Sequence, residues 1–279
     1  MEYRHINVSK LSPHVGAEIE GVDIARGISD DVFDEIKKAF LEHGVIFMRD
    51  QKLSFDDQIQ FAQRFGPLGK HVGVNTISKT TDNPWVRKFH YDETSTRISG
   101  ENFHSDQSCA EIPPLGSMLY NHTIPPHNGG NTLFASMYAA YDALSESMKQ
   151  YLQGLTAMHD GTRVFGPGTP SCSHPVIIQH PETGKNLIYV NTDFTSHIEG
   201  VSALESRHIL EYLYQHCAKP EWTCRFNWTP HSFALWDNRC THHKAVWDYW
   251  PNIRSGYRVQ IEGTQRPIAA TETRSVKVA

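Results

Sequence analysis

Hydrophobic residues in the first part of the chain recur at helical spacing in two places. One such pattern runs from Ser29, a potential cap, to about His43 and is followed by glycine, which predicts a helix with a defined start and end. A second pattern begins at Ser54 and stops before Gly66. Between the two, the continuous apolar run from Val45 to Met48 predicts a buried strand.

Further along, short segments rich in aromatic and β-branched residues predict strands. They cover residues 116–122, 132–135, 187–191, 222–228, 233–236 and 257–261. Two helices are expected among them, one over 137–155 and one that opens with a Ser-x-x-Glu capping box at Ser202 and runs to about Cys217. Residues 72–101 lose periodicity and predict long loops with at most one strand, near 86–89. We expect one domain, residues 1–279, in which helices flank an antiparallel barrel.

Composition and charge exclude several classes of protein. The formal net charge is -5 and the longest basic run is Lys37-Lys38, so a nucleic-acid surface is not expected. No leader-like or membrane-length apolar run occurs, and we expect a cytoplasmic protein. Five cysteines without C-x-x-C spacing predict free thiols instead of disulfides or a structural zinc site.

Histidine is abundant, with 17 residues, and imidazole is a common metal ligand. Two imidazoles and one carboxylate bind Fe(II) on one face and leave positions open for other ligands. The matching local pattern is H-x-D or H-x-E, because residues one apart on a strand point the same way. Four segments fit it, so the pattern alone selects none: His104-Ser-Asp106, His90-Tyr-Asp92, His180-Pro-Glu182 and His197-Ile-Glu199.

A more specific signal is the stretch W-D-N-R-C-T-H-H, which ends at His243 and is followed by Arg258. Together with the upstream H-S-D at His104, it resembles the taurine dioxygenase and chlorophenoxy-alkanoate dioxygenase family. Nearly the whole chain takes part, through residues 16–23, 64–67 and the Gly-Gly-Asn-Thr segment ending at Thr132. The resemblance implies a mainly β fold with flanking helices, a double-stranded β-helix (jelly roll). It also implies an enzyme, a dioxygenase that uses Fe(II), 2-oxoglutarate and O2.

The family pattern implies that His104, Asp106 and His243 are the catalytic iron ligands. His243 is the histidine seven residues after Trp236. Neighbours on a strand face opposite ways, so only one of His242 and His243 can reach the ion, and His242 stays the alternative.

An arginine in the apolar segment 257–261 needs a partner if it is buried. Arg258 is therefore our candidate for the distal carboxylate of 2-oxoglutarate, which a guanidinium binds in fork geometry; an outward-facing arginine is the alternative. The resemblance adds Thr132 at the same carboxylate and Arg254 near the carboxylate bound at iron. Asn131 replaces the usual aspartate of that segment.

Three positions match residues that line the substrate pocket of the taurine enzyme: His71, Phe165 and Phe194. Ordinary core packing is the alternative for the two phenylalanines. Gly100 departs from the taurine enzyme, which has asparagine there, while residues 163–166 and 136–138 are closer to the phenoxypropionate enzymes. We expect hydroxylation of a small organic anion, a sulfonate, phosphonate or aryloxy or alkyl carboxylate. Succinate and CO2 would be released, and the hydroxylated carbon–heteroatom bond could then break.

Two other classes of protein share parts of this pattern. A cupin-type metal-binding jelly roll without oxygenase activity would keep the three ligands but need no arginine for a dicarboxylate. A zinc hydrolase also uses two histidines and a carboxylate. By analogy with the family we expect a homo-oligomer, a dimer or tetramer.

Overall fold

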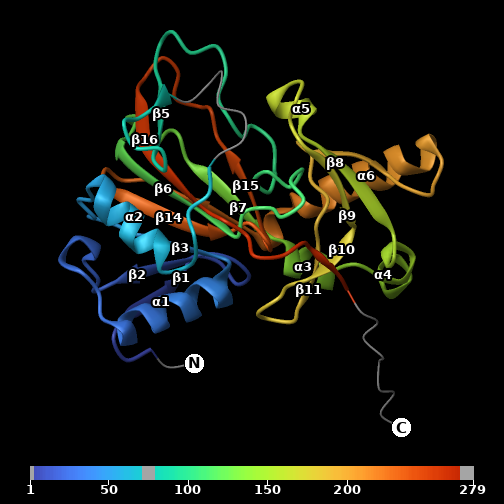
Figure 1. Cartoon of the computed structure of the whole chain (residues 1–279), viewed down its shortest axis with the longest axis horizontal. Coiled ribbons are helices and arrows are strands. Elements are labelled where there is room, and N and C mark those ends of the chain that lie inside the picture. Colours follow the sequence, from blue (N-terminus) through green and yellow to red (C-terminus); the bar gives the residue numbers. More distant parts are fainter. Residues whose placement is uncertain (1–2, 71–78, 271–279) are drawn as a thin grey trace.

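The largest element of the fold is an eight-stranded sheet (Figure 1). The computed structural model describes residues 3–70 and 79–270. Neighbouring strands of this sheet run antiparallel except for the parallel pair β2 and β3. Its order is β1 (Asn7–Lys10), β2 (Ala17–Glu20), β3 (Val45–Met48), β14 (Ser232–Asp237), β6 (Gly116–Thr123), β16 (Arg254–Ile261), β5 (Arg87–Tyr91) and β4 (Lys79–Thr80).

Three smaller sheets, each of three strands, complete the β structure. The first lies at the centre of the view in Figure 1 and contains β13 (Thr223–Phe226), β7 (Thr132–Ser136) and β15 (Thr241–Ala245). The second contains β12 (Thr195–Ile198), β8 (Thr156–Asp160) and β9 (Ser171–Pro175). The third contains β11 (Asn186–Ile188), β10 (Ile177–Gln179) and β17 (Ile268–Ala269).

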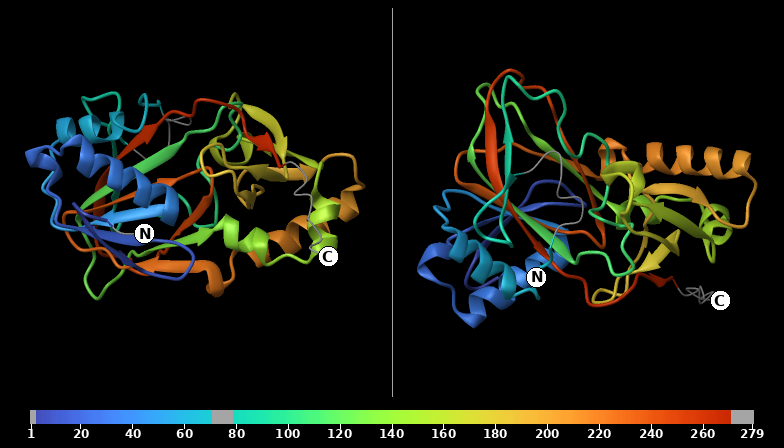
Figure 2. Two further views of the ribbon diagram at one scale, coloured as in Figure 1. Left: turned by 90° about the horizontal axis from the view of Figure 1, so that it is seen from below. Right: turned by 45° about the horizontal axis from the view of Figure 1, so that its top comes forward.

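Two amphipathic helices cover the outer face of the large sheet, as the apolar spacing predicts. They are α1 (Asp30–His43) and α2 (Phe55–Gln63). Ser29 and Ser54 cap them, and Gly44 ends α1 in the left-handed conformation that glycine adopts without strain. Their buried faces join the outward-facing side chains of β6, β14 and β16 in one hydrophobic cluster. Figure 2 shows both helices at the opposite end of the molecule from the yellow strands.

The expected helix over 137–155 is wrong as a single element. It is divided into α3 (Met137–Asp142) and α4 (Glu146–Leu152), and the side chain of Ser145 caps the second. The Ser145 hydroxyl oxygen accepts a hydrogen bond from the backbone N–H three residues ahead. This bond favours the start of a new helix at Ser145 over continuation of α3. The remaining helical segments are α5 (Thr162–Phe165), α6 (Ala203–Cys217) and the 3-10 turns η1 (Ile24–Arg26) and η2 (Pro220–Trp222).

A second hydrophobic cluster lies between the inner face of the large sheet and the β13-β7-β15 sheet. Phe47 of β3 stacks on Phe226 of β13 with ring centroids 3.9 Å apart, and it meets Phe134 of β7 edge-on. The two sheets therefore pack face to face around aromatic side chains, as in a jelly roll.

Most predicted strands are present with shifted ends, whereas β1, β2, β4, β8, β9, β10, β12 and β17 were not predicted. Since β4 and β5 both lie within residues 72–101, the expectation of at most one strand there is wrong. The unpredicted strands are four or five residues long or shorter and carry polar residues such as those of β9, Ser-Cys-Ser-His-Pro, so their periodicity is weak. The five cysteines are free thiols, as expected. Within the described ranges, no helix combines the length and apolar character that a membrane crossing requires.

Candidate metal centre

His104 and His243 lie opposite one another in an isolated antiparallel bridge. The backbone N–H of His104 donates to the carbonyl of His243 at 3.1 Å, and that of His243 donates to the carbonyl of His104 at 2.9 Å. Residues that face each other in this way project their side chains to the same side. The two imidazole rings accordingly lie with centroids 4.1 Å apart.

Asp106 completes a buried cluster of three potential ligands. Its Oδ1 lies 3.6 Å from Nε2 of His104 and 3.7 Å from Nε2 of His243. Two atoms bound to one ion at roughly 2.1 Å each lie at most about 4.2 Å apart, so all three side chains can reach a common ion. Oδ1 is the carboxylate oxygen that faces both histidines.

The other carboxylate oxygen of Asp106 is held by protein donors. Ser117 on β6 donates its hydroxyl to Oδ2 at 2.8 Å, and Arg258 on β16 also contacts Oδ2. Ser117 in turn accepts hydrogen bonds from Asn238 at 3.1 Å and from Arg258 at 2.9 Å. Because Oδ2 is occupied, Asp106 can offer only Oδ1 to an ion.

Asn238 belongs to the W-D-N-R turn and ties this network to it. Its Oδ1 accepts the indole N–H of Trp236 at 2.9 Å and the backbone N–H of Asp106 at 3.4 Å. Trp236 also packs on His243, with ring centroids 4.6 Å apart. The turn therefore positions two of the three cluster residues. Sequence reasoning used this turn to locate His243 but missed the roles of Ser117 and Asn238.

The electrostatics of Asp106 and His243 suit a cation. Burial alone would raise the pKa of Asp106, but Arg258, His243 and His104 hold that pKa well below its ordinary value. Burial, followed by the neighbouring charges of His104 and Arg258, lowers the pKa of His243 well below its ordinary range. An ionised carboxylate and a neutral imidazole are the forms that bind metals.

His242 points away from Asp106 and belongs to a different environment. It is 2% exposed, its Nε2 has no hydrogen-bond partner among the described residues, and burial lowers its pKa to about 3. Because neighbours on β15 alternate sides, the bridge that turns His243 toward His104 turns His242 away. The structure thus brings His243, not His242, into the cluster.

In the described part of the chain, two of the other H-x-D/E segments bring no three ligands together. His197 is exposed, and His90 lies 3.4 Å from Asp92 with no third ligand near them. His180 does join a second buried group, with Asp237 and Cys240. However, Arg239 donates to both carboxylate oxygens of Asp237, at 2.8 Å and 2.7 Å. The guanidinium of Arg239 therefore already neutralises the charge that a metal ion would need.

Arg254 lies in a separate buried environment on β16. It is 6% exposed, and its Nε and Nη2 have no hydrogen-bond partner among the described residues. Its guanidinium carbon lies 5.7 Å from the centre of the Trp228 ring, and the Trp228 indole N–H donates to Thr132 Oγ1 at 3.0 Å. Burial lowers the pKa of Arg254. A buried guanidinium with open donors is a site for an anion.

Gly130 allows this arginine to lie against the turn before β7. Its φ is +70°, and a Cβ atom there would come within 2.9 Å of Arg254 Cδ. Thr132 begins β7 and pairs with Ala245, two residues beyond His243 on β15. Contacts therefore group Thr132 with Arg254, whereas Arg258 lies at the metal cluster.

The predicted substrate residues are partly placed. Phe165 on α5 and Phe194 pack together with ring centroids 5.5 Å apart, and Phe194 is 2% exposed. The adjacent Asp193 has a carboxylate oxygen 3.7 Å from Nδ1 of His104, so the chain next to Phe194 approaches the metal cluster. His71 lies outside the described residues. At Gly100, φ is +78° and a Cβ would approach His104 Cε1 to 2.9 Å, so a side chain there would disturb the cluster.

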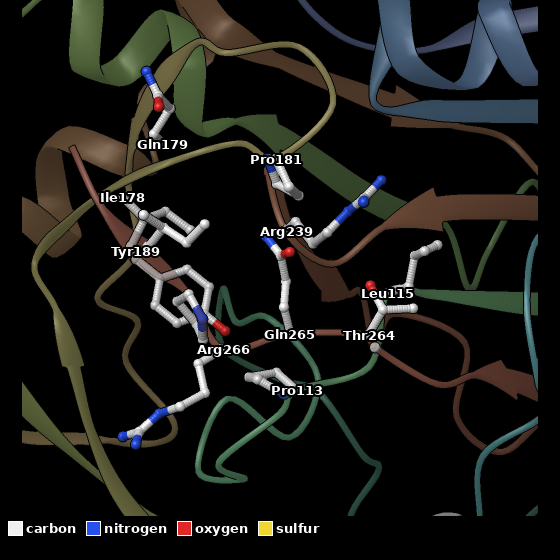
Figure 3. Close-up of a pocket in the computed structure, with 13 residues that line it drawn as sticks. Pro113, Leu115, Ile178, Gln179, Pro181, Tyr189, Arg239, Thr264, Gln265 and Arg266 are labelled. Atoms are coloured by element: carbon white, nitrogen blue, oxygen red, sulfur yellow. The ribbon is translucent and has the colours of Figure 1, made fainter. Parts of the chain in front are cut away.

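A separate hollow lies beside Arg239 of the W-D-N-R turn (Figure 3). Its walls include Leu115, Ile178, Tyr189, Arg239 and Pro267. None of the three potential metal ligands lines it. Two arginines line it, and both are paired: Arg239 with Asp237 and Glu182, and Arg266 with Glu111.

The family model for "Taurine catabolism dioxygenase TauD, TfdA family" matches residues 7–260. The chain belongs to this family. A TauD/TfdA relative from Schizosaccharomyces pombe, named a putative alpha-ketoglutarate-dependent sulfonate dioxygenase, is 32% identical over 92% of this chain and 69% of its own length. An alpha-ketoglutarate-dependent 2,4-dichlorophenoxyacetate dioxygenase of Cupriavidus pinatubonensis is 30% identical over 84% of this chain and 90% of its own.

A solved structure supports the fold of this TauD/TfdA chain. A putative alpha-ketoglutarate-dependent taurine dioxygenase from Burkholderia xenovorans superposes with a TM-score of 0.85 at 35% identity, covering 95% of this chain and 91% of the other. The prediction of a mainly β jelly roll with flanking helices is confirmed. So is the prediction of an oxidoreductase, a dioxygenase that depends on Fe(II), 2-oxoglutarate (alpha-ketoglutarate) and O2.

Proposed function

We propose that His104, Asp106 and His243 hold the catalytic Fe(II) and that this dioxygenase hydroxylates a small organic anion. The observation that carries the proposal is the position of Asp106 Oδ1, 3.6 Å and 3.7 Å from the Nε2 atoms of the two histidines. One carboxylate and two imidazoles on one side suit Fe(II) and leave its other positions open. The donor atoms, their burial and the occupied Oδ2 of Asp106 all fit this ion.

The bound iron and 2-oxoglutarate would supply the oxidising chemistry, in which 2-oxoglutarate is converted to succinate and CO2. The protein's own part is to orient the co-substrate and the substrate and to exclude water. Two buried arginines on the same face of β16, Arg254 and Arg258, are available to orient the anionic groups of the co-substrate and the substrate.

Arg254 and Thr132 are our candidates for the distal carboxylate of 2-oxoglutarate. That carboxylate is separated by two methylene groups from the end that chelates the metal, so its partner must stand away from the metal ligands. Arg258 contacts Asp106 directly, whereas Arg254 precedes it by four residues on β16. At about 3.3 Å per residue, the backbones of the two arginines are roughly 13 Å apart along the strand. The open Nε and Nη2 donors of Arg254 suit a carboxylate.

Arg258 is then best placed for an anionic group close to the metal. Its Nη2 is given to Asp106 and Ser117, while its Nε has no hydrogen-bond partner among the described residues. This division of roles reverses the one expected from the sequence, in which Arg258 took the distal carboxylate and Arg254 approached the iron. The contact of Arg258 with Asp106 and the position of Arg254 against Trp228 support this reversal.

For the substrate, we propose a small organic anion with an apolar body. Phe165 and Phe194 would form an aromatic wall beside His104, and Arg258 would receive the negative group. His71 stays a prediction for the same pocket. Names of the relatives support this class, since they refer to a sulfonate, to 2,4-dichlorophenoxyacetate and to taurine. Hydroxylation next to a heteroatom would let the product cleave there.

We further propose that residues 1–279 form one dioxygenase domain that works in the cytoplasm as a dimer or tetramer. Five free cysteines suit a reducing compartment. Light scattering coupled to size-exclusion chromatography measures the assembly; a monomer at micromolar concentration contradicts that part of the proposal.

The deciding experiment is anaerobic addition of Fe(II) and 2-oxoglutarate to metal-free protein. We expect the weak visible charge-transfer band of the chelate, and its loss in Asp106→Ala. Absence of the band in the natural protein contradicts the proposed site. A cupin-type binding protein would bind the metal without the band, and a zinc hydrolase would show no dependence on 2-oxoglutarate.

A further inference from the structure

The loop between β11 and β12 packs against the segment that carries His104. The backbone N–H of Thr192 donates to the carbonyl of Phe103 at 3.4 Å. The side-chain amide of Asn102 donates to Asp193 Oδ1 at 3.0 Å. The other oxygen of Asp193, Oδ2, lies 3.7 Å from Nδ1 of His104. Asp193 was not among the residues singled out from the sequence.

The hydrogen bond at Nδ1 of His104 defines how this ring can meet an ion. Nδ1 lies 2.9 Å from the carbonyl oxygen of Asn102. A carbonyl oxygen can only accept a hydrogen bond, so Nδ1 carries the proton and Nε2 offers its lone pair. Nε2 is the nitrogen that lies 3.6 Å from Asp106 Oδ1. The bond made by the second ring nitrogen fixes the tautomer and the orientation of a metal-binding histidine.

Asp193 supports this arrangement from beside the ring. Its bond to the Asn102 side chain anchors the residue whose carbonyl orients His104. Asn102 is exposed, whereas the Asp193 side chain is 14% exposed, so the carboxylate is the better-fixed partner of the two. A carboxylate close to Nδ1 also favours the tautomer with the proton on that nitrogen. Without Asp193, both the orientation and the tautomer of His104 lose support.

Arg163 attaches the same loop to α5. Its side chain donates to the backbone carbonyl of Thr192 at 3.2 Å and also to that of Thr195. Asp193 and Phe194 lie between these two bonds in the chain. The ring of Phe194 packs on α5 as well. One loop therefore joins a wall of the proposed substrate pocket to the aspartate that contacts a proposed metal ligand.

We propose that Asp193 is a positioning residue for His104 and that, through it, the loop of residues 192–194 ties the substrate side of the pocket to the metal centre. The proposal rests on the proposed function, in which His104 binds the iron and Phe194 lines the substrate pocket. It adds a route by which the position of this loop sets the affinity for the metal.

The test measures binding of Mn(II) to metal-free protein by the electron paramagnetic resonance signal of the free ion. His104→Gln is the reference for loss of a ligand. We expect Asp193→Ala to weaken Mn(II) binding by about tenfold or more, as for other residues that support a metal ligand. Asp193→Asn keeps an oxygen that can accept the bond from Asn102, so it should weaken binding by only about threefold.

A double-mutant cycle tests the connection through the loop. Arg163→Gln removes the bonds to the two carbonyls that flank Asp193 and should weaken Mn(II) binding by about threefold. In the Asp193→Ala background, the same change should have less than about a 1.5-fold effect, because residues of one network are not additive. A general loss of structure would instead add to the effect of Asp193→Ala.

Asp92→Ala is the matched control. Asp92 also lies beside a histidine, 3.4 Å from His90, but outside the metal cluster. Mn(II) binding should change by less than about twofold. Thermal unfolding without metal shows whether each variant is folded, and Asp193→Ser takes the place of Asp193→Ala if the alanine variant does not fold.

Three results would overturn the positioning role of Asp193. They are Mn(II) binding by Asp193→Ala within about threefold of the natural protein, binding by Asp193→Asn as weak as by Asp193→Ala, and an undiminished effect of Arg163→Gln in the Asp193→Ala background. The proposed function fails separately. Unchanged affinity in His104→Gln, or no Mn(II) binding by the natural protein, would overturn the proposed metal site itself.

Discussion

His104 and His243 exchange two backbone hydrogen bonds, although one precedes β6 and the other lies on β15 near the end of the chain. This bridge directs both imidazoles to the same side, where Asp106 Oδ1 lies within 3.7 Å of each Nε2. Backbone pairing therefore sets the geometry of the metal centre. It also decides which of two adjacent histidines takes part.

The two histidines of β15 should differ in their effect on metal binding. His243→Gln removes a proposed ligand, and we expect metal affinity to fall by more than about 100-fold. His242→Gln replaces a side chain on the opposite face and should cost much less. Competition with a chelator measures both affinities. A larger loss in His242→Gln would show that the register of β15 is not the one described.

Ser117 should act as a positioning residue for Asp106. Ser117→Ala leaves Oδ2 with one donor fewer, and we expect metal affinity to drop by about 10-fold to 100-fold while the fold is kept. Ser173→Ala is a suitable control, because its hydroxyl also donates to a carboxylate at 2.8 Å, that of Glu199, away from the centre. Equal metal affinities of the two variants would contradict this role.

Substitutions of Arg254 and Arg258 should have different effects on the binding of 2-oxoglutarate. Arg254→Gln removes the proposed partner of the distal carboxylate, so the concentration that half-saturates the chelate band should rise by about tenfold or more. Thr132→Val should raise it by a smaller factor. Arg258→Gln should impair binding of the primary substrate more than that of 2-oxoglutarate. The opposite order would restore the assignment expected from the sequence.

Asp237 should make stability depend on pH. Burial would raise its pKa, but Arg239 and His180 hold it below the ordinary value, so the unfolded chain takes up the proton first as pH falls. Its contribution is complete above the unfolded pKa near 4 and is lost as pH decreases further. Asp237→Asn should therefore lower the free energy of unfolding by about 3 to 5 kcal/mol at pH 7.

Urea denaturation of this variant and of the natural protein checks the prediction. The difference between them should shrink as pH falls from 5 toward 3, because protonation of this carboxylate in the unfolded chain progressively removes the stabilisation. Asp30→Asn removes an exposed partner of Arg64 and is the control. A difference that stays constant over this range would show that Asp237 acts through packing instead of charge.

Local sequence predicted the elements whose signals are local. Ser29, Gly44, Ser54 and Ser202 cap or end helices where their side chains or backbone conformations require it. A cap is defined by bonds to residues three or four positions away, so the sequence carries the whole interaction. Ser145 carries the same local signal, but the apolar spacing continues across it, and α3 and α4 were predicted as one helix.

The candidate site also has a part that the sequence predicts and a part that only the tertiary structure decides. The sequence by itself determined the chemistry: an H-x-D pair, a distant histidine, two arginines and a threonine, which the family pattern selected from a histidine-rich chain. Only the tertiary structure decided that His243 faces Asp106 and that Thr132 belongs with Arg254. These relationships depend on strand pairing between distant segments, and a shift of one residue in register would turn every side chain to the other face.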